Sequence, residues 1–414
     1  MNRPALSDEE FTLLSDPAAR KKAMGDALLT IQNRSISGEK YRLDKGAVLN
    51  NVHFINCNFL GHFMFSVNMN NVSFTDCGIA SVRWEGGVWE NISFNDCIFV
   101  GGEVSIVAGK GNGEFLYQGC SFEGDPPNDG MRDSELALRG EVSATGRAFF
   151  RKCKFQRMFV RAGSEATFSN CVFEYVHLEP LHEEWSIDKL SFDQCKGNYL
   201  DMSDRRYGTI SIRNSQFFSV DMSKIIGRSV ELDNVAGHYD LPGSLLDKIS
   251  ATRCAFIHPD KSADEETGWG LCILGMETKT LEISDCTFQG ENARIVLRGD
   301  PEKRDEHGKL IPWKLDSGRV LSYASLADSI TIKNTPLHHA DFTYVHAKTV
   351  TLENLTISDS NLAHSKFDKL TLKNVKLSGV LDFTDTQSKS VLTESLTRDI
   401  GLNLVTDKAS KIEL

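Results

Sequence analysis

The chain has 414 residues, which is enough for two or three ordinary domains or for one long array of repeats. Its formal net charge of −11 disfavours a broad surface that grips nucleic-acid phosphates, although an acidic chain could itself imitate such a polymer. Hydrophobic residues make up 40% of the chain and charged residues 25%, a composition that argues against large disordered tracts.

Residues 1–48 are predicted to form a helical N-terminal segment and cap. Asp16 and Pro17 have the features of a helix start, because an N-cap residue precedes a proline at the first helical position. The stretch AARKKAMGDALLTIQ is expected to continue this helix. Leu28, Leu29 and Ile31 are available to close the first coil of the repeats that follow.

From residue 54 onward, the sequence carries a period of five. Every fifth residue is large and apolar: Phe54, Phe59, Met64, Met69, Phe74, Ile79, Trp84, Trp89, Phe94 and Phe99. Neither an α-helix, with a period of 3.6, nor a strand, with a period of 2, produces this spacing. A chain that turns a corner every five residues does, and four such sides close one coil of about twenty residues.

This pattern resembles the pentapeptide-repeat family, whose consensus is a small residue, Asp or Asn, Leu or Phe, and two further residues. The match is clearest in Cys57-Asn58-Phe59, Val67-Asn68-Met69, Ala340-Asp341-Phe342 and Ser360-Asn361-Leu362. The resemblance implies an all-β fold, a right-handed parallel β-helix with four sides. In that fold the large residue and the small residue two positions before it both point inward, which makes Trp84 and Trp89 core residues.

A strand-like motif followed by a position for a small inward residue, the small slot, recurs along the chain and marks successive coils. Examples are FRKCKF (150–155) and LKNVKL (372–377). It predicts a β-helix of about fourteen coils over residues 49–388, with residues 389–414 as a C-terminal cap and tail. Because each coil is too thin to bury its own apolar side, stability is expected to come from stacking on neighbouring coils.

Four insertions interrupt the coils, at residues 123–147, 179–188, 257–270 and 289–320. Each falls after the second side of one coil and before the first side of the next, so the loops are expected to gather on one flank. Long loops on a regular scaffold are the usual location of binding or catalysis.

The insertions supply the candidate partner-binding residues. Tryptophan and arginine dominate the energetic hot spots of protein interfaces. The candidates are Trp185, Trp269, Arg298, Arg304 and Trp313. The alternative interpretation is that each tryptophan pins its own loop to the scaffold.

Nine of the ten cysteines occupy one repeat slot, where other coils carry Ser215, Val235, Thr335 and Leu355. A slot that accepts Ser, Val, Thr and Leu selects for size, and a free cysteine behaves as a small buried hydrophobe. These cysteines are therefore predicted to be structural. Cys272 lies outside the slot, and the alternation around it leaves an outward, catalytic thiol as a weak alternative.

Asp201 and Asp221 lie one coil apart and are weak candidates for general-acid catalysis, because stacked carboxylates raise one another's pKa. Asp before a large inward residue is also the ordinary outward position of the repeat. His177, His182 and Glu183 are weak metal-ligand candidates, since a site needs at least three converging ligands. No metal and no cofactor is expected.

Three classes of function remain open. The first is a non-enzymatic scaffold that binds a protein partner through loops on one flank. Residues 21–54 also resemble, more loosely, the entry into the β-helix domains of bacterial type III secreted effectors, in some of which a ubiquitin-ligase domain follows. Here the repeats fill almost the whole chain and leave no room for that domain. An enzyme is therefore the less favoured interpretation.

The second class is the gyrase-binding DNA mimic that the pentapeptide-repeat resemblance suggests, although the insertions and Lys303, Arg304 and Lys309 interrupt a smooth acidic surface. The third is a carbohydrate-active β-helix enzyme that would use Asp201 and Asp221. Direct nucleic-acid binding is not expected.

No apolar segment near the N-terminus indicates a Sec signal, and no apolar run approaches the length of a membrane span. The expected location is the bacterial cytoplasm, or a host cell after export by a route without a Sec signal. The sequence leaves the oligomeric state open.

Overall fold

The chain turns a corner wherever Asn, Asp or Gly precedes the small repeat slot. In the computed structural model, Asn56, Asp76 and Asp96 have φ angles of 52–53°, and Gly119 has 67°. This left-handed backbone region is sterically costly for most residues and least costly for Gly, Asn and Asp. The recurring Asn-Cys and Asp-Cys pairs therefore mark the corners of the coils, with the small residue directly after each corner.

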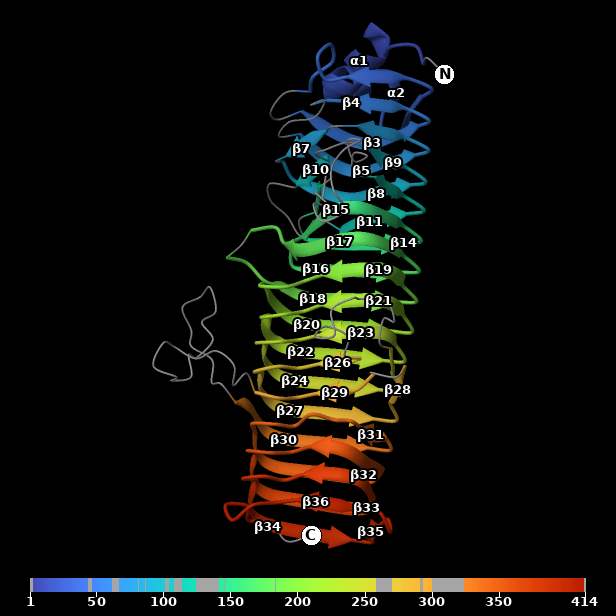
Figure 1. The fold of residues 1–414 in the computed structure, drawn as a ribbon. Helices are drawn as coiled ribbons and strands as arrows, with labels where there is room; N and C mark the ends of the chain where they lie inside the picture. The colour runs from blue at the N-terminus through green and yellow to red at the C-terminus, as the bar shows by residue number, and fades with distance from the viewer. Residues whose placement is uncertain are drawn as a thin grey trace, which may run out of the picture. The chain divides into compact units, whose positions relative to one another are not determined.

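The structure describes residues 3–43, 47–61, 67–80, 82–85, 87–100, 104–107, 114–123, 141–144, 146–182, 184–257, 270–290, 293–299 and 324–412. Their contacts divide the chain into two compact units, Met1–Asp201 (unit 1) and Met202–Leu414 (unit 2). Each unit is a parallel β-helix, with about 15 turns in all among the described residues. The predicted right-handed β-helix is confirmed as the fold class (Figure 1).

Unit 1 has two continuous faces and a shorter third one, and its described strands pair in parallel. The first-face strands are β1 (Leu29–Gln32), β3 (Val48–Ile55), β5 (Asn68–Thr75), β8 (Trp89–Asn95), β11 (Glu114–Gln118), β14 (Arg147–Arg151), β16 (Glu165–Ser169) and β18 (Ile187–Asp193). The second-face strands are β2 (Ser35–Ser37), β4 (Asn58–Leu60), β6 (Gly78–Ala80), β9 (Ile98–Val100), β12 (Ser121–Glu123), β15 (Lys154–Ala162), β17 (Val172–Pro180) and β19 (Lys196–Asp201). The third face holds β7 (Arg83–Glu85), β10 (Val104–Val107) and β13 (Glu141–Ala144), and β13 pairs with the end of β15.

Unit 2 repeats this plan with longer first-face strands. They are β20 (Arg206–Arg213), β22 (Ile226–Asp233), β24 (Leu245–Thr252), β27 (Glu277–Ser284), β30 (Ser325–Lys333), β34 (Gln387–Glu394) and the first halves of β32 (Val345–Asn361) and β33 (Lys366–Asp382). The second face contains the remaining halves of β32 and β33 with β21 (Gln216–Asp221), β23 (Ala236–Asp240), β25 (Ala255–Ile257), β28 (Thr287–Gln289), β31 (Leu337–His338) and β35 (Thr397–Arg398). The third face holds β26 (Leu271–Cys272), β29 (Ile295–Val296) and β36 (Asn403–Val405).

The core of unit 1 is a ladder of stacked aromatic rings. Phe74 stacks on Phe94 with centroids 4.7 Å apart, Phe94 on Tyr117 at 4.9 Å, and Tyr117 on Phe150 at 4.7 Å. Trp84 and Trp89 are fully buried, as the period of five predicts. Strand pairing holds these rings at the spacing of successive coils, so the stacking contributes to stability beyond the burial of apolar area.

The cysteines of the small slot are all buried and free. The Cys97 thiol lies 3.4 Å from the carbonyl oxygen of Asn95 and 3.5 Å from that of Phe74 in the preceding coil. The neighbouring Cys120 thiol, together with burial, raises the pKa of Cys97 above its usual range. A protonated buried thiol is unreactive, which supports the structural interpretation for Cys97. In Cys171 and Cys254, hydrogen bonds from neighbouring cysteines lower the pKa instead, so for these two the structural interpretation rests on their burial.

Two helices precede the first coil of unit 1. In α1 (Asp8–Ser15), Ser7 and Glu10 form a capping box, and in α2 (Pro17–Met24) the Asp16 carboxylate accepts two backbone N–H groups. Glu10 also pairs with Arg34 at 2.8 Å, which ties α1 to the first coil. No helix among the described residues is long and apolar enough to cross a membrane.

The helix predicted through AARKKAMGDALLTIQ is shorter than expected. It ends at Gly25, whose φ of 64° stops the helix, and Leu29–Gln32 form β1 instead. Leu29 and Ile31 are buried and pair with Val52 and Phe54, whereas Leu28 is 50% exposed. β1 pairing overrides the helical tendency of this segment because it buries two apolar side chains.

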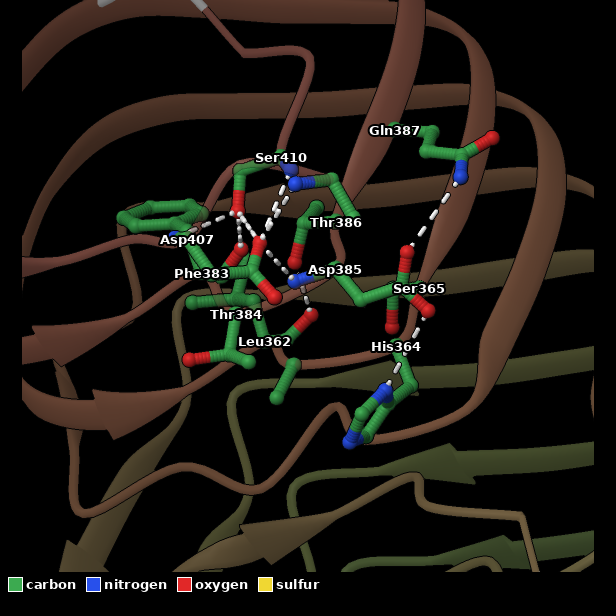
Figure 2. Close-up of polar contacts among 12 residues, drawn as sticks. Leu362, His364, Ser365, Phe383, Thr384, Asp385, Thr386, Gln387, Asp407 and Ser410 are labelled. Carbon is green, nitrogen blue, oxygen red and sulfur yellow. Dashed lines mark hydrogen bonds and ion pairs between the residues drawn. The ribbon is translucent and has the colours of Figure 1, made fainter.

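The last coil of unit 2 ends in a turn held by one carboxylate (Figure 2). Asp407 Oδ1 accepts hydrogen bonds from the backbone N–H groups of Asp385, Ala409 and Ser410 and from the Ser410 hydroxyl. The Ser410 hydroxyl also lies 2.8 Å from the carbonyl oxygen of Phe383. The hydrogen bond from Ser410 and those from the backbone lower the pKa of Asp407.

We predict that Cys97→Ser costs about 1 kcal/mol or less of unfolding free energy. Ser215 occupies the same slot in unit 2 and donates to the carbonyl oxygen of Arg213 at 2.6 Å. Cys97→Asp should cost about 3 kcal/mol or more, because it buries an unpaired charge. Urea unfolding followed by circular dichroism compares the two variants, and equal losses would contradict a buried slot that accepts small neutral side chains and excludes charge.

We predict that Asp407→Ala loosens the last coil of unit 2. Hydrogen–deuterium exchange should accelerate in residues 383–411, while exchange in β20 and β22 stays unchanged because stability in a solenoid is local. In the wild type, the protection factors of the same amides, corrected for the intrinsic pH dependence of exchange, should fall as the pH falls through the lowered pKa of Asp407. Unchanged exchange at the C-terminal end would show that this carboxylate does not hold the cap.

Candidate functional site

A surface groove of about 680 Å³ crosses the first face of unit 2. It runs across the strands, because each of six successive coils contributes the beginning of its first-face strand, from β22 to β33. The lining residues are Ile226, Gly227, Leu245, Leu246, Asp247, Glu277, Thr278, Lys279, Leu326, Ala327, Asp328, His346, Ala347, Lys348, Lys366 and Asp368.

The floor of the groove exists because three neighbouring coils carry small side chains at one position. Thr278, Ala327 and Ala347 are partners in register and are 7–8% exposed. In the coils on either side, the same position is occupied by the larger residues Leu246 and Phe367, each 4% exposed. A run of small residues between two larger ones lowers the floor of the groove at these three coils.

One rim of the groove is a ladder of alternating charge. Lys279 Nζ lies 2.7 Å from Asp247, and Lys348 Nζ lies 2.7 Å from Asp328. The hydrogen bond to Asp247 raises the pKa of Lys279, and the one to Asp328 raises that of Lys348. Exposed ion pairs of this kind contribute little to stability, so a bound partner could replace them at small cost.

The opposite rim changes character along its length. Ile226, Leu245 and Leu326 are half-buried apolar residues, and the carboxylate Glu277 lies between Leu245 and Leu326. His346 and Lys366 follow in the next two coils. Burial, and then the charge of Lys366, lower the pKa of His346, so its imidazole is neutral at neutral pH. Lys366 is exposed and forms no ion pair with any described residue.

In unit 1, a second cluster brings together four charged side chains from three coils. His177 Nδ1 lies 2.8 Å from Asp201 Oδ2, and its Nε2 lies 3.4 Å from Glu179 Oε2. Arg161 Nε donates to Glu179 Oε1 at 2.6 Å. Burial opposes a charge on the ring, but the hydrogen bonds to Asp201 and Glu179 outweigh it and raise the pKa of His177 to about 9.

This cluster neutralises itself, since two cations face two carboxylates and both ring nitrogens of His177 are occupied. Asp201 is thus a partner of His177. In unit 2, Asp221 accepts hydrogen bonds from the backbone N–H and hydroxyl of Ser223. Asp341 and Asp382 accept backbone N–H groups in the same way. Asp221 therefore shapes a corner, as does Asp in other coils of unit 2.

Cys272 is buried, at 2% exposure, so the weak alternative of an outward, catalytic thiol is wrong. Burial and the neighbouring Asp240 raise its pKa well above the usual value, so no nucleophilic thiolate forms. Leu271 and Ile273 are buried with it. The alternation of a single strand does not hold here because the segment forms a two-residue strand next to a corner.

Two of the candidate partner-binding residues are among the described residues, one in each unit. Trp185 is 52% exposed and packs edge-on against the exposed His182, with centroids 4.3 Å apart. Arg298, in unit 2, is half-buried and lies 3.9 Å from Asp341. Trp269, Arg304 and Trp313 lie outside the described residues.

Two of the three weak metal-ligand candidates are among the described residues, and they contact different partners. His177 belongs to the ion-pair cluster, His182 packs on Trp185, and Glu183 lies outside the described residues. Within the described ranges, no group of three or more His, Cys, Asp or Glu side chains could hold a metal ion.

The groove itself was not predicted from the sequence. Its signal is an alternation of Asp and Lys at one repeat position, in Asp247, Lys279, Asp328, Lys348 and Asp368. Reading that signal needs the register across the insertions, since Thr278 and Ala327 are partners although 49 positions separate them in the sequence. The regular spacing of twenty residues is lost at this point.

No protein-family model matches the sequence, and no curated protein is significantly similar to it. Among solved structures, the alginate lyase AlyF-OU02 in complex with G6 is 10% identical over 95% of this chain and 86% of that one, with a TM-score of 0.30. A PL6 alginate lyase with a trisaccharide is 8% identical over 99% and 95%, with a TM-score of 0.28. The A-module of the Azotobacter vinelandii mannuronan C-5 epimerase AlgE6 is 8% identical over 96% of each chain, with a TM-score of 0.19. Likenesses of this size carry no information about activity or substrate.

We predict that His177→Gln destabilises unit 1 by about 1–2 kcal/mol at pH 6, once solvent screening is allowed for. The folded-state pKa of His177 is raised, from 6.5 to about 9, so its contribution is complete below pH 6.5 and is lost as the pH rises through about 9. Unfolding measured from pH 6 to pH 10 should show the variant and the wild type converging. His182→Gln serves as the exposed control, and a pH-independent loss for His177→Gln would contradict this assignment.

Proposed function

We propose that the protein is a non-enzymatic binding scaffold and that a protein partner docks in the groove of unit 2. The observation that carries this proposal is the groove itself, a depression with an apolar floor and chemically different rims across six coils. Concave surfaces that combine apolar area with a few placed polar groups are the usual binding sites of proteins. The proposed surface is therefore a strand face, whereas the insertions were expected from the sequence to bind the partner.

The charge pattern favours a protein over a nucleic acid as the partner. Asp247, Asp328 and Asp368 alternate with lysines along the rim, so the groove presents no field of a single sign. A phosphate backbone, or a gyrase surface that recognises a DNA mimic, is matched by charges of one sign. A polypeptide carries both signs and apolar side chains, which fit the two rims.

The energetics of the groove also suit a partner that binds reversibly. An aliphatic side chain buried fully on the floor would contribute roughly 1.5–3 kcal/mol. Rim lysines such as Lys279 and Lys348 can exchange an exposed carboxylate of their own chain for one of the partner. Charged rims of this kind add specificity and speed of association more than affinity.

A second candidate function is a β-helix enzyme that acts on carbohydrate. Its candidate residues are in the cluster of unit 1, where His177 lies between Asp201 and Glu179. A substrate would have to displace one of these carboxylates from the ring before His177 could donate its proton. An assay for new reducing ends on a panel of neutral and acidic polysaccharides tests it. Cleavage that His177→Gln abolishes would establish this candidate, and the absence of cleavage across the panel would exclude it for those substrates.

We predict that Ala347→Phe abolishes partner binding without unfolding the protein. Phe367 occupies the equivalent position of the next coil, so the backbone accepts a phenyl group there, and the new ring fills the groove. Partners captured by the wild type should be lost, and calorimetry with the purified partner should show Kd weakened at least about tenfold.

Ala347→Ser is the matched control, because it changes the same residue and leaves the groove open. It should bind like the wild type, and circular dichroism should show both variants folded. A purified partner that binds Ala347→Phe with unchanged Kd would refute the groove as the working surface.

A further inference from the structure

We infer that the groove selects an extended peptide segment of its partner, with an aliphatic side chain at one end and a carboxylate at the other. This inference rests on the proposed function and adds the chemistry of the ligand. It follows from the difference between the two ends of the groove.

The end formed by β22 and β24 is apolar. Ile226 and Leu245 are half-buried and partners in register, and Gly227 and Leu246 form the floor beside them. Gly227 cannot be replaced without strain, since a Cβ there would lie 2.4 Å from the carbonyl oxygen of Tyr207. The absence of a side chain at Gly227 leaves room for an aliphatic group of a ligand.

The end formed by β32 and β33 carries a cation that the described residues leave unpaired. The rim lysines Lys279 and Lys348 each contact an aspartate at 2.7 Å, whereas Lys366 forms no ion pair with a described residue. His346 is its partner in register and is half-buried, with no hydrogen bond to a described side chain. A neutral imidazole N–H beside an ammonium group is suited to receive one carboxylate.

The distance between these ends sets the length of the ligand. Five steps between neighbouring coils, each at the ~4.8 Å spacing of strands in a sheet, separate Ile226 from Lys366 by about 24 Å. An extended peptide advances about 3.3 Å per residue, so its aliphatic and acidic residues should be roughly seven positions apart. Between them, the alternating rim accepts polar side chains of either sign.

A uniform polyanion fits this groove poorly. It would place like charges against Asp247, Asp328 and Asp368, and it offers no aliphatic group to the apolar end. A peptide satisfies both ends at once. An acidic oligosaccharide is therefore the competing ligand that the experiment must separate.

The test uses the full-length protein and a phage library of random twelve-residue peptides. We expect enrichment of peptides in which Leu, Ile or Val and Asp or Glu lie about seven positions apart. Fluorescence anisotropy with one enriched peptide should show binding weakened roughly tenfold by Lys366→Glu. Repeating the selection with Lys366→Glu should replace the acidic residue of the peptides by Lys or Arg.

Lys369→Glu is the matched control, because Lys369 is an exposed lysine of β33 that does not line the groove. It should leave the selection and the affinity unchanged. Enriched peptides whose acidic bias survives Lys366→Glu would overturn the inference. The inference would also be overturned if the selection enriched no peptide while an acidic oligosaccharide bound the wild type and failed to bind Ala347→Phe.

The two proposals fail in different ways. If a natural partner is lost with Ala347→Phe but no peptide is enriched, the groove is the docking surface and only its selectivity for a peptide is wrong. If the partner binds Ala347→Phe unchanged, the proposed function fails as well.

Discussion

Parallel pairing of successive coils, in register apart from local shifts, is the constraint on which each unit depends. Because the same repeat position recurs in each coil, side chains of one position stack into a column along the helix. Inside, the columns are aromatic rings and thiols, such as Phe94 on Phe74 and Cys97 beside Cys120. At the corners they are amides, such as Asn234 on Asn214 at 2.9 Å. On the first face of unit 2 the same rule produces the alternating charges and the groove.

Register also explains what the sequence could predict. The inward residues of the first coils were predictable because five-residue spacing is preserved there, and Phe54, Trp84 and Phe99 are all buried. The burial of Cys272 was not predictable, because an insertion precedes it and interrupts the spacing. Its strand has only two residues, which is too short for the alternation of neighbouring residues to indicate which side chains point inward. The groove depends on differences in side-chain size between coils, such as Ala347 against Phe367, which appear only after the coils are aligned.

The two charged clusters differ in how readily their side chains can exchange their present contacts for those of a bound partner. In unit 1, His177 is paired with both Glu179 and Asp201, and these contacts raise the pKa of His177. A closed cluster of this kind supports the fold locally. In unit 2, the rim pairs are exposed and Lys366 has no carboxylate among the described residues. Groups that can change partners at small cost belong on a binding surface, which is why the groove carries the functional proposal.

The most direct test of the groove as the working surface is acetylation footprinting of lysines with and without the bound partner. Lys279, Lys348 and Lys366 line the groove, whereas Lys369 in β33 and Lys189 in unit 1 do not. Docking in the groove predicts that the partner slows acetylation of the first three and leaves the other two unchanged. Protection of Lys189 with no change at Lys279, Lys348 and Lys366 would contradict the account.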